Sequence, residues 1–141
     1  MKRSVATAAQ NEERAEEQVL LVEDDLGLQK QMRWALSPYV VEVADSRAAA
    51  LEKISSSTFR VVILDLGLPP DENGASEGLK TLDEILNAAP QTKVIIASGN
   101  VERANAVKAV ANGAFDFIAK PIDSEVLKLV IGRALRMSEL E

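Results

Sequence analysis

Short apolar runs alternate along the chain with longer segments in which apolar residues have helical spacing. From residue 18 onward this alternation repeats five times. The expected strands are Val19–Glu23, Val40–Ala44, Arg60–Leu64, Lys93–Ala97 and Phe115–Ala119. The expected helices are Leu26–Ser37, Arg47–Ser55, Glu77–Ala88, Val101–Asn112 and Ser124–Leu140. Five such βα units predict an α/β fold, in which a parallel sheet carries helices on both faces.

Two of the expected strands are apolar along their whole length. The runs Val61–Leu64 and Val94–Ala97 are typical of strands that are covered on both faces, so we expect them at the centre of the sheet. Helix boundaries agree with this division, because Ser46 and either Asp123 or Ser124 have side chains suited to cap a helix start.

The first 17 residues differ from the rest of the chain. They are polar and lack a turn-length apolar stripe, which predicts a disordered leader at residues 1–17 followed by one domain at residues 18–141. A chain of 141 residues that is 47% hydrophobic is long enough for one single-core domain and short for two. We expect the last helix to continue into a linker toward output domains that lie outside this sequence.

Composition excludes several classes of function. The chain has no Cys and no His, which excludes disulfides, thiolate chemistry, imidazole zinc sites and Ser-His-Asp catalysis. Net charge is -6 and no basic block appears, so we expect no direct contact with nucleic acid. No apolar run approaches about 20 residues and no signal-peptide core follows the start, so we expect no membrane association and a soluble, cytoplasmic protein.

Four of the apolar runs end in a residue that can handle a metal ion or a phosphoryl group. These residues are the pair Glu23 and Asp24, then Asp65, Ser98 and Lys120. The carboxyl ends of parallel strands share one edge, where open α/β sheets place their sites. Three close carboxylates repel one another unless a cation lies among them, and ligation by oxygen alone favours Mg²⁺. One polar strand end is usually a solvated cap, but four together predict a site.

Four motifs in the chain resemble the receiver domain of two-component response regulators. In chain order they are Leu21-Val22-Glu23-Asp24-Asp25, Leu64-Asp65-Leu66-Gly67-Leu68-Pro69, Ile96-Ala97-Ser98-Gly99 and Gly113-Ala114-Phe115-Asp116-Phe117-Ile118-Ala119-Lys120-Pro121. The resemblance covers roughly residues 19–135. It implies a flavodoxin-like, doubly wound, five-stranded parallel sheet in the order 2-1-3-4-5 with five helices.

Within this family the chain resembles particular subgroups. The last motif is similar to receivers attached to sigma-54-dependent transcription activators. The segment Gly67–Asp71 and the last seven residues resemble a subgroup associated with PEP-CTERM protein-sorting and exopolysaccharide loci. The resemblance therefore implies transcription regulation through sigma-54 RNA polymerase, contacted by domains that lie outside this sequence.

The resemblance also implies a phosphoryl acceptor and a metal site. Asp65 would take a phosphoryl group from a phosphohistidine on a sensor histidine kinase. Mg²⁺ would be bound by Asp24 and Asp65, by Glu23 largely through water, and by the main-chain carbonyl of Gly67. Such a domain catalyses its own phosphoryl transfer and slow self-dephosphorylation, and is no dedicated enzyme.

Further roles implied by the resemblance concern the response to phosphorylation. Lys120 would contact the phosphoryl oxygens, and Ser98 would donate a hydrogen bond to one of them. Phe117 would turn inward once Ser98 moves, and the Lys120–Pro121 bond would be cis. We interpret Asp25 as a helix N-cap in preference to a metal ligand.

Two segments depart from the simplest receiver pattern. The loop after Asp65 is longer than usual by about four residues, with Gly78 as the loop glycine and 71–74 as an insertion that alters access or partner choice. The last helix carries apolar residues over much more than the arc of about 100° that one buried face needs, so we expect part of its surface to contact a partner. The resemblance implies that this partner is a second copy of the chain, in a homodimer. We expect Trp34 and Tyr39 to serve packing.

Other classes of function remain to be weighed. A phosphatase of the haloacid dehalogenase type needs a second Asp two residues after the nucleophile, where this chain has Gly67. A flavin-phosphate site needs a hydroxyl- and glycine-rich loop after the first strand, where the acidic residues 23–25 repel phosphate. A receiver-like interaction module that works without phosphorylation is the alternative, because fold alone does not fix function.

Overall fold

The structure is a computed structural model and describes residues 17–72, 74–99 and 103–141. The strands are β1 (Gln18–Val22), β2 (Val40–Ala44), β3 (Val61–Asp65), β4 (Lys93–Ser98) and β5 (Asp116–Ala119). The helices are α2 (Leu26–Ala35), α3 (Arg47–Ser56), α4 (Ser76–Ala88), α5 (Arg103–Ala111) and α6 (Ser124–Glu139). Each predicted element is present with its ends within a residue or two, although the start expected at Val101 lies outside the described residues, as does most of the leader.

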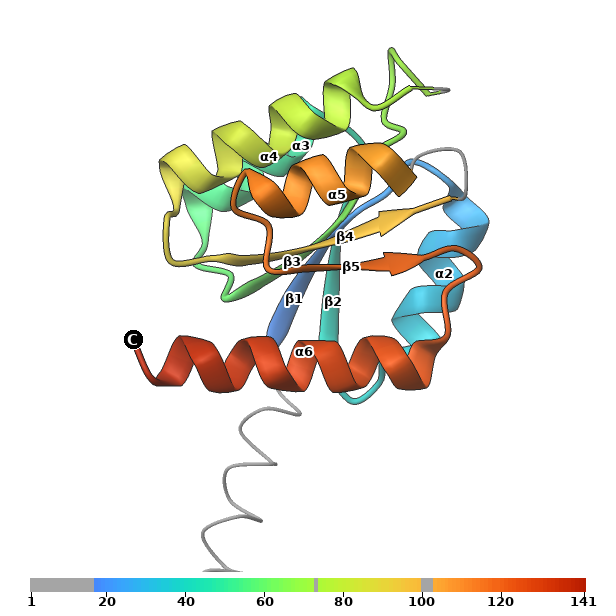
Figure 1. Ribbon diagram of the computed structural model, residues 1–141. Coiled ribbons are helices and arrows are strands. Elements are labelled where there is room, and N and C mark those ends of the chain that lie inside the picture. Colours follow the sequence, from blue (N-terminus) through green and yellow to red (C-terminus); the bar gives the residue numbers. More distant parts are fainter. Residues whose placement is uncertain (1–16, 73, 100–102) are drawn as a thin grey trace, which may run out of the picture.

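All five strands are parallel and lie in the order β2-β1-β3-β4-β5, which confirms the predicted topology. Helices α2 and α6 cover one face of the sheet, and α3, α4 and α5 cover the other (Figure 1). The direction of winding reverses between β1 and β3. Open α/β sheets place their sites at the carboxyl ends of the strands that flank such a reversal.

Each face of the sheet has its own hydrophobic core. Every residue of β3 is buried, as its unbroken apolar run predicts for a central strand. Residues of α4 such as Leu82 and Ile85 are buried against one face. Residues of α6 such as Leu127 and Ile131 are buried against the other. The two cores hold the strands rigidly, so that the residues at the strand ends have fixed positions.

The helix starts and ends follow the local sequence. The side chains of Asp25, Ser46 and Asp123 each accept a hydrogen bond from a main-chain N–H in the first turn of the following helix, which confirms the predicted caps. Gly113, which follows α5, has a φ of 119°, a conformation that side-chain-bearing residues rarely adopt.

The packing role expected for Trp34 is wrong. This side chain is 85% exposed on α2, whereas Met32 and Leu36 are buried beneath the same helix. At 100° per residue Trp34 lies on the side of the helix opposite Met32, so packing of Met32 turns the indole to solvent. Tyr39 is half-buried and packs against the core beneath α2 and α6, as expected.

None of the helices in the described part of the chain is long and apolar enough to cross a membrane.

Candidate functional site

The residues predicted from the strand ends lie along one edge of the sheet. They are distributed as follows: Glu23 and Asp24 follow β1, Asp65 ends β3, Ser98 ends β4, and Lys120 follows β5. The register fixes their spacing, because Asp65 pairs with Ala97 and Ser98 pairs with Ala119. Ser98 therefore lies one residue beyond the β4 partner of Asp65, and Lys120 lies one residue beyond the β5 partner of Ser98.

Three carboxylates converge at this edge. Glu23, Asp24 and Asp65 each offer an oxygen atom, and these atoms all lie within 4.8 Å of one another. Glu23 and Asp65 are buried, with 3% and 5% of their surface exposed, and Asp24 is half-buried. The donor set contains oxygen alone, the chemistry that hard divalent cations such as Mg²⁺ prefer.

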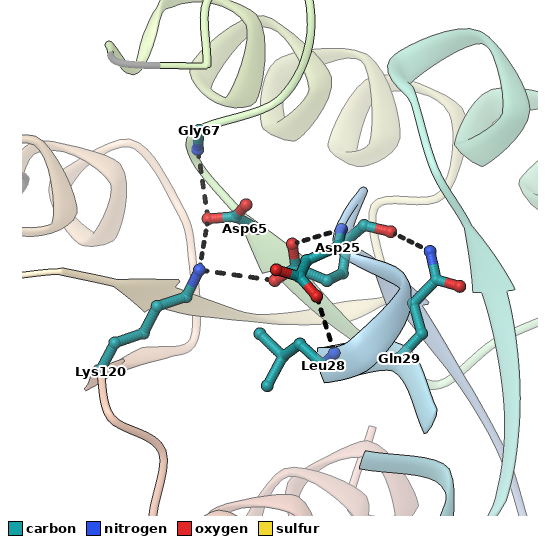
Figure 2. Close-up of polar contacts among 7 residues, drawn as sticks. Asp25, Leu28, Gln29, Asp65, Gly67 and Lys120 are labelled. Carbon is teal, nitrogen blue, oxygen red and sulfur yellow. Dashed lines mark hydrogen bonds and ion pairs between the residues drawn. The ribbon is translucent and has the colours of Figure 1, made fainter. Parts of the chain in front are cut away.

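Lys120 crosses the edge to reach two of these acids. Its Nζ lies 3.1 Å from Oδ1 of Asp65 and 3.4 Å from Oε1 of Glu23. Oδ1 of Asp65 also accepts a hydrogen bond of 3.2 Å from the main-chain N–H of Gly67. Figure 2 shows the lysine side chain extended toward Asp65 from one side, with α2 on the other. One positive charge thus faces a cluster of acids.

Burial makes this cluster electrostatically unusual. The pKa of Glu23 is raised from 4.5 to about 7, first by burial and then by repulsion from Asp65, against the opposing effect of Lys120. Burial alone would lower the pKa of Lys120, but the carboxylates of Asp65 and Glu23 outweigh it and raise that pKa. Lys120 therefore stays charged, while Glu23 titrates near neutral pH.

The start of α2 and the residue before it hold Glu23 in place. The main-chain carbonyl of Glu23 accepts a hydrogen bond of 2.6 Å from Nε2 of Gln29, and its Oε2 accepts one of 3.2 Å from the N–H of Asp25 (Figure 2). Oδ1 of Asp25 in turn accepts a hydrogen bond of 2.9 Å from the N–H of Leu28. Asp25 is therefore the N-cap of α2, as interpreted from the sequence. Sequence reasoning missed Gln29, whose only signal is its position in the first turns of the helix that follows the acids.

Three more of the predicted residues line the β4–β5 side. The carbonyl of Ser98 accepts a hydrogen bond of 2.6 Å from the N–H of Lys120, which ties the ends of the two strands together. Phe117 is half-buried and packs against the core beneath α3, α4 and α5. The Lys120–Pro121 bond is cis, as the resemblance implied.

In the loop that precedes α4, Asp71 lies five residues before Ser76, and the two side chains are hydrogen-bonded. Oδ2 of Asp71 accepts hydrogen bonds from the N–H of Ser76 at 3.3 Å and from its Oγ at 2.5 Å. The carbonyl of Asp71 accepts from the N–H of Gly74 at 3.2 Å. Asp71 thus stabilises the start of α4, a role that the sequence did not indicate.

Comparison with known proteins identifies the family. Residues 19–132 match the family model described as the response regulator receiver domain. This chain belongs to that family. The match confirms the family predicted from the four motifs.

Individual relatives agree with this assignment. The chain is 28% identical over 125 residues to the regulatory protein AtoC of Escherichia coli, with 87% of this chain and 26% of AtoC covered. It is 32% identical over 127 residues to the transcriptional regulatory protein ZraR of Klebsiella oxytoca, with 86% and 27% covered. The receiver spans about a quarter of the length of these regulators.

Solved structures match the receiver over nearly its whole length. A receiver domain protein of Clostridium thermocellum superposes with a TM-score of 0.80 at 26% identity, covering 88% of this chain and 98% of that one. The receiver domain of NtrX from Brucella abortus superposes with a TM-score of 0.76 at 33% identity, covering 84% of this chain and 98% of that one.

Proposed function

We propose that this receiver accepts a phosphoryl group on Asp65 from a phosphohistidine of a sensor histidine kinase, with Mg²⁺ as cofactor. The observation that carries the proposal is the convergence of Glu23, Asp24 and Asp65 opposite Lys120 at the carboxyl edge of the sheet. An anionic donor can approach a carboxylate only where other groups offset the charge. Membership of the receiver family supports the same assignment.

The residues present fit a magnesium ion. The donors are oxygens, and the raised pKa of Glu23 reflects a buried acid whose ionised form a nearby dication would favour. Asp24, Asp65 and the carbonyl of Gly67 would hold the ion, with Glu23 acting largely through water. When bound, the ion supplies positive charge that offsets the carboxylates and the phosphoryl oxygens.

The chemistry of the chain itself is a simple displacement. One carboxylate oxygen of Asp65 forms a bond to phosphorus as the bond from phosphorus to the histidine nitrogen breaks, and the electron pair stays on the imidazole. Lys120 pairs with the phosphoryl oxygens that Asp65 now carries. Water later hydrolyses the acyl phosphate slowly, so the domain switches without being a dedicated enzyme.

Phosphorylation is then relayed to the surface. Ser98 donates a hydrogen bond to the phosphoryl group, and Phe117 turns toward the space that Ser98 leaves. The expected recipient is a homodimer surface on α6, where Val126, Leu129 and Met137 are 45%, 75% and 44% exposed. Exposed apolar residues gathered on one helix support an interface.

The output that we propose is transcription control in the cytoplasm. The curated relatives include proteins named as transcriptional regulators, of which the receiver forms a minor part. Domains outside this sequence would act on sigma-54 RNA polymerase and DNA, while residues 18–141 form the receiver and contact no nucleic acid themselves. Residues 1–17 would be a leader.

A stable phosphate mimic tests the metal-dependent site. Beryllofluoride with Mg²⁺ should shift the amide resonances of Asp65 and Gly67 in the wild-type protein. Asp24→Ala should lose the shift, because it removes a ligand, while Asp25→Asn, which keeps the helix cap, should retain it. Equal shifts in wild type and Asp24→Ala would refute the metal site. No shift in any variant would favour the alternative, an interaction module that works without phosphorylation.

A further inference from the structure

The first turn of α4 approaches the main chain beside Asp65 unusually closely. Gly78 is buried in this turn, and a Cβ atom at position 78 would lie 2.4 Å from Cα of Leu66, 2.5 Å from its oxygen and 2.7 Å from its carbonyl carbon. All three are main-chain atoms, so no side-chain rotation can relieve the overlap. Only a residue without a side chain fits there while the helix and the strand end keep these positions.

Helix α4 is held firmly by its contacts with α3 and with the core. Arg47 at the start of α3 reaches two carboxylates of α4, with Nε 2.9 Å from Oε2 of Glu77 and a terminal nitrogen 2.8 Å from Oε1 of Glu84. Leu82 and Ile85 of the same helix are buried in the core with 1% and 0% of their surface exposed. Withdrawal of α4 would break both sets of contacts, so a methyl group at position 78 presses on the main chain of Leu66.

Leu66 joins the two groups on which the site depends. It lies between Asp65, whose Oδ1 pairs with Lys120, and Gly67, whose N–H donates to the same oxygen. A displacement of the Leu66 main chain therefore turns the Asp65 carboxylate and moves the Gly67 peptide together. The side chain of Leu66 is fully buried, which leaves the main chain little freedom to absorb the change elsewhere.

We propose that Gly78 is a positioning residue for phosphoryl acceptance, which sets the place of Asp65 and of the Gly67 peptide by letting α4 rest on the main chain of Leu66. Gly78 touches neither the acids nor Lys120 and acts through Leu66 alone. The inference rests on the proposed function of the acidic site. It assigns to α4 control over the geometry of that site.

Another helical glycine provides a matched control. Gly132 lies within α6, and a Cβ atom built there meets nothing within 4 Å. Replacement of either glycine by alanine adds the same methyl group, and alanine is the better helix former at both positions. Only Gly78→Ala adds the overlap with Leu66.

The test measures Mn²⁺ affinity, by titration of amide resonances, and labelling by acetyl phosphate in wild type, Gly78→Ala, Gly132→Ala and the double variant. We expect Gly78→Ala to bind Mn²⁺ at least about tenfold more weakly than wild type and to be labelled more slowly by acetyl phosphate. Tenfold is about the smallest loss of metal affinity that follows when residues orienting the metal ligands are removed. Gly132→Ala should match wild type. The double variant gains stability from position 132 and should remain as weak in Mn²⁺ binding as Gly78→Ala.

A merely structural role gives a different pattern. Gly78→Ala would then unfold at lower temperature but bind Mn²⁺ and accept phosphate as wild type does, which would overturn the inference and leave the proposed function standing. Absence of Mn²⁺ binding and of labelling in wild type and Gly132→Ala alike would overturn the proposed function, and the inference with it.

Discussion

At the scale of single residues, Glu23 carries a large electrostatic cost. Burial and the neighbouring Asp65 raise its pKa from 4.5 to about 7. At a pH below the pKa of Glu23 in the unfolded protein, the folded and unfolded proteins both hold the proton, so stability does not change with pH. Between the unfolded and folded pKa values only the unfolded protein has lost the proton, so a rise in pH lowers the stability of the metal-free protein. Above about pH 7 the full penalty, on the order of 3 kcal/mol, is present.

Glu23→Gln should remove this penalty. We expect the variant to match wild type in free energy of unfolding near pH 4 and to be more stable by about 2 kcal/mol or more at pH 8, both measured by urea unfolding with a chelator present. Glu52→Gln, an exposed replacement on α3, serves as the control and should show no such trend. A constant difference between Glu23→Gln and wild type across this range would show that Glu23 is not an unfavourably ionised acid.

At the scale of elements, the start of α4 shows how a loop residue replaces a local cap. Ala75, at the N-cap position, makes no side-chain hydrogen bond to the helix. Asp71 provides the missing acceptor from four residues further back through its contacts with Ser76. Asp71 therefore ties the loop before α4 to the helix that rests on Leu66.

Asp71→Ala should lower the free energy of unfolding by about 1 kcal/mol, the usual effect of losing a cap. Metal affinity should stay unchanged, because the contacts of Asp71 lie with Ser76 and not with the acids. Glu72→Ala, an exposed change in the same loop, should alter neither quantity. A weaker Mn²⁺ affinity in Asp71→Ala alone would place this loop acid in the electrostatics of the site instead.

The sequence predicted elements better than contacts between them. Strands and helices could be recognised because apolar residues repeat with the period of each element, and the strand-end acids follow from topology. The helical period places Trp34 opposite the buried Met32, which explains why Trp34 is exposed instead of packed. The bond from Gln29 to the carbonyl of Glu23 and the approach of Gly78 to Leu66 depend on packing, which no local pattern records.

At the scale of the whole molecule, two surfaces expose large apolar side chains on helices that cover the same face of the sheet. Leu129 on α6 is 75% exposed and Trp34 on α2 is 85% exposed. The proposed dimer uses α6 and leaves α2 free. This difference allows one surface to serve as the control for the other.

Beryllofluoride with Mg²⁺ should strengthen self-association of the wild-type protein in sedimentation at several concentrations. Leu129→Ser should weaken the association of the activated form by about fivefold or more, because truncation of a central apolar contact at an interface costs more than 1 kcal/mol. Trp34→Ser should leave association unchanged. Equal association of the activated wild type and Leu129→Ser would remove α6 from the interface.

The proposed function depends most on Asp65 as the phosphoryl acceptor. Incubation with acetyl phosphate and Mg²⁺, followed by intact mass and peptide mapping, measures it directly. We predict one phosphoryl group on the peptide that contains Asp65, absent when a chelator removes the metal and absent in Asp65→Asn. Full labelling of Asp65→Asn, or a phosphoryl group found on Ser98 in the wild-type protein, would contradict the assignment of Asp65 as the acceptor.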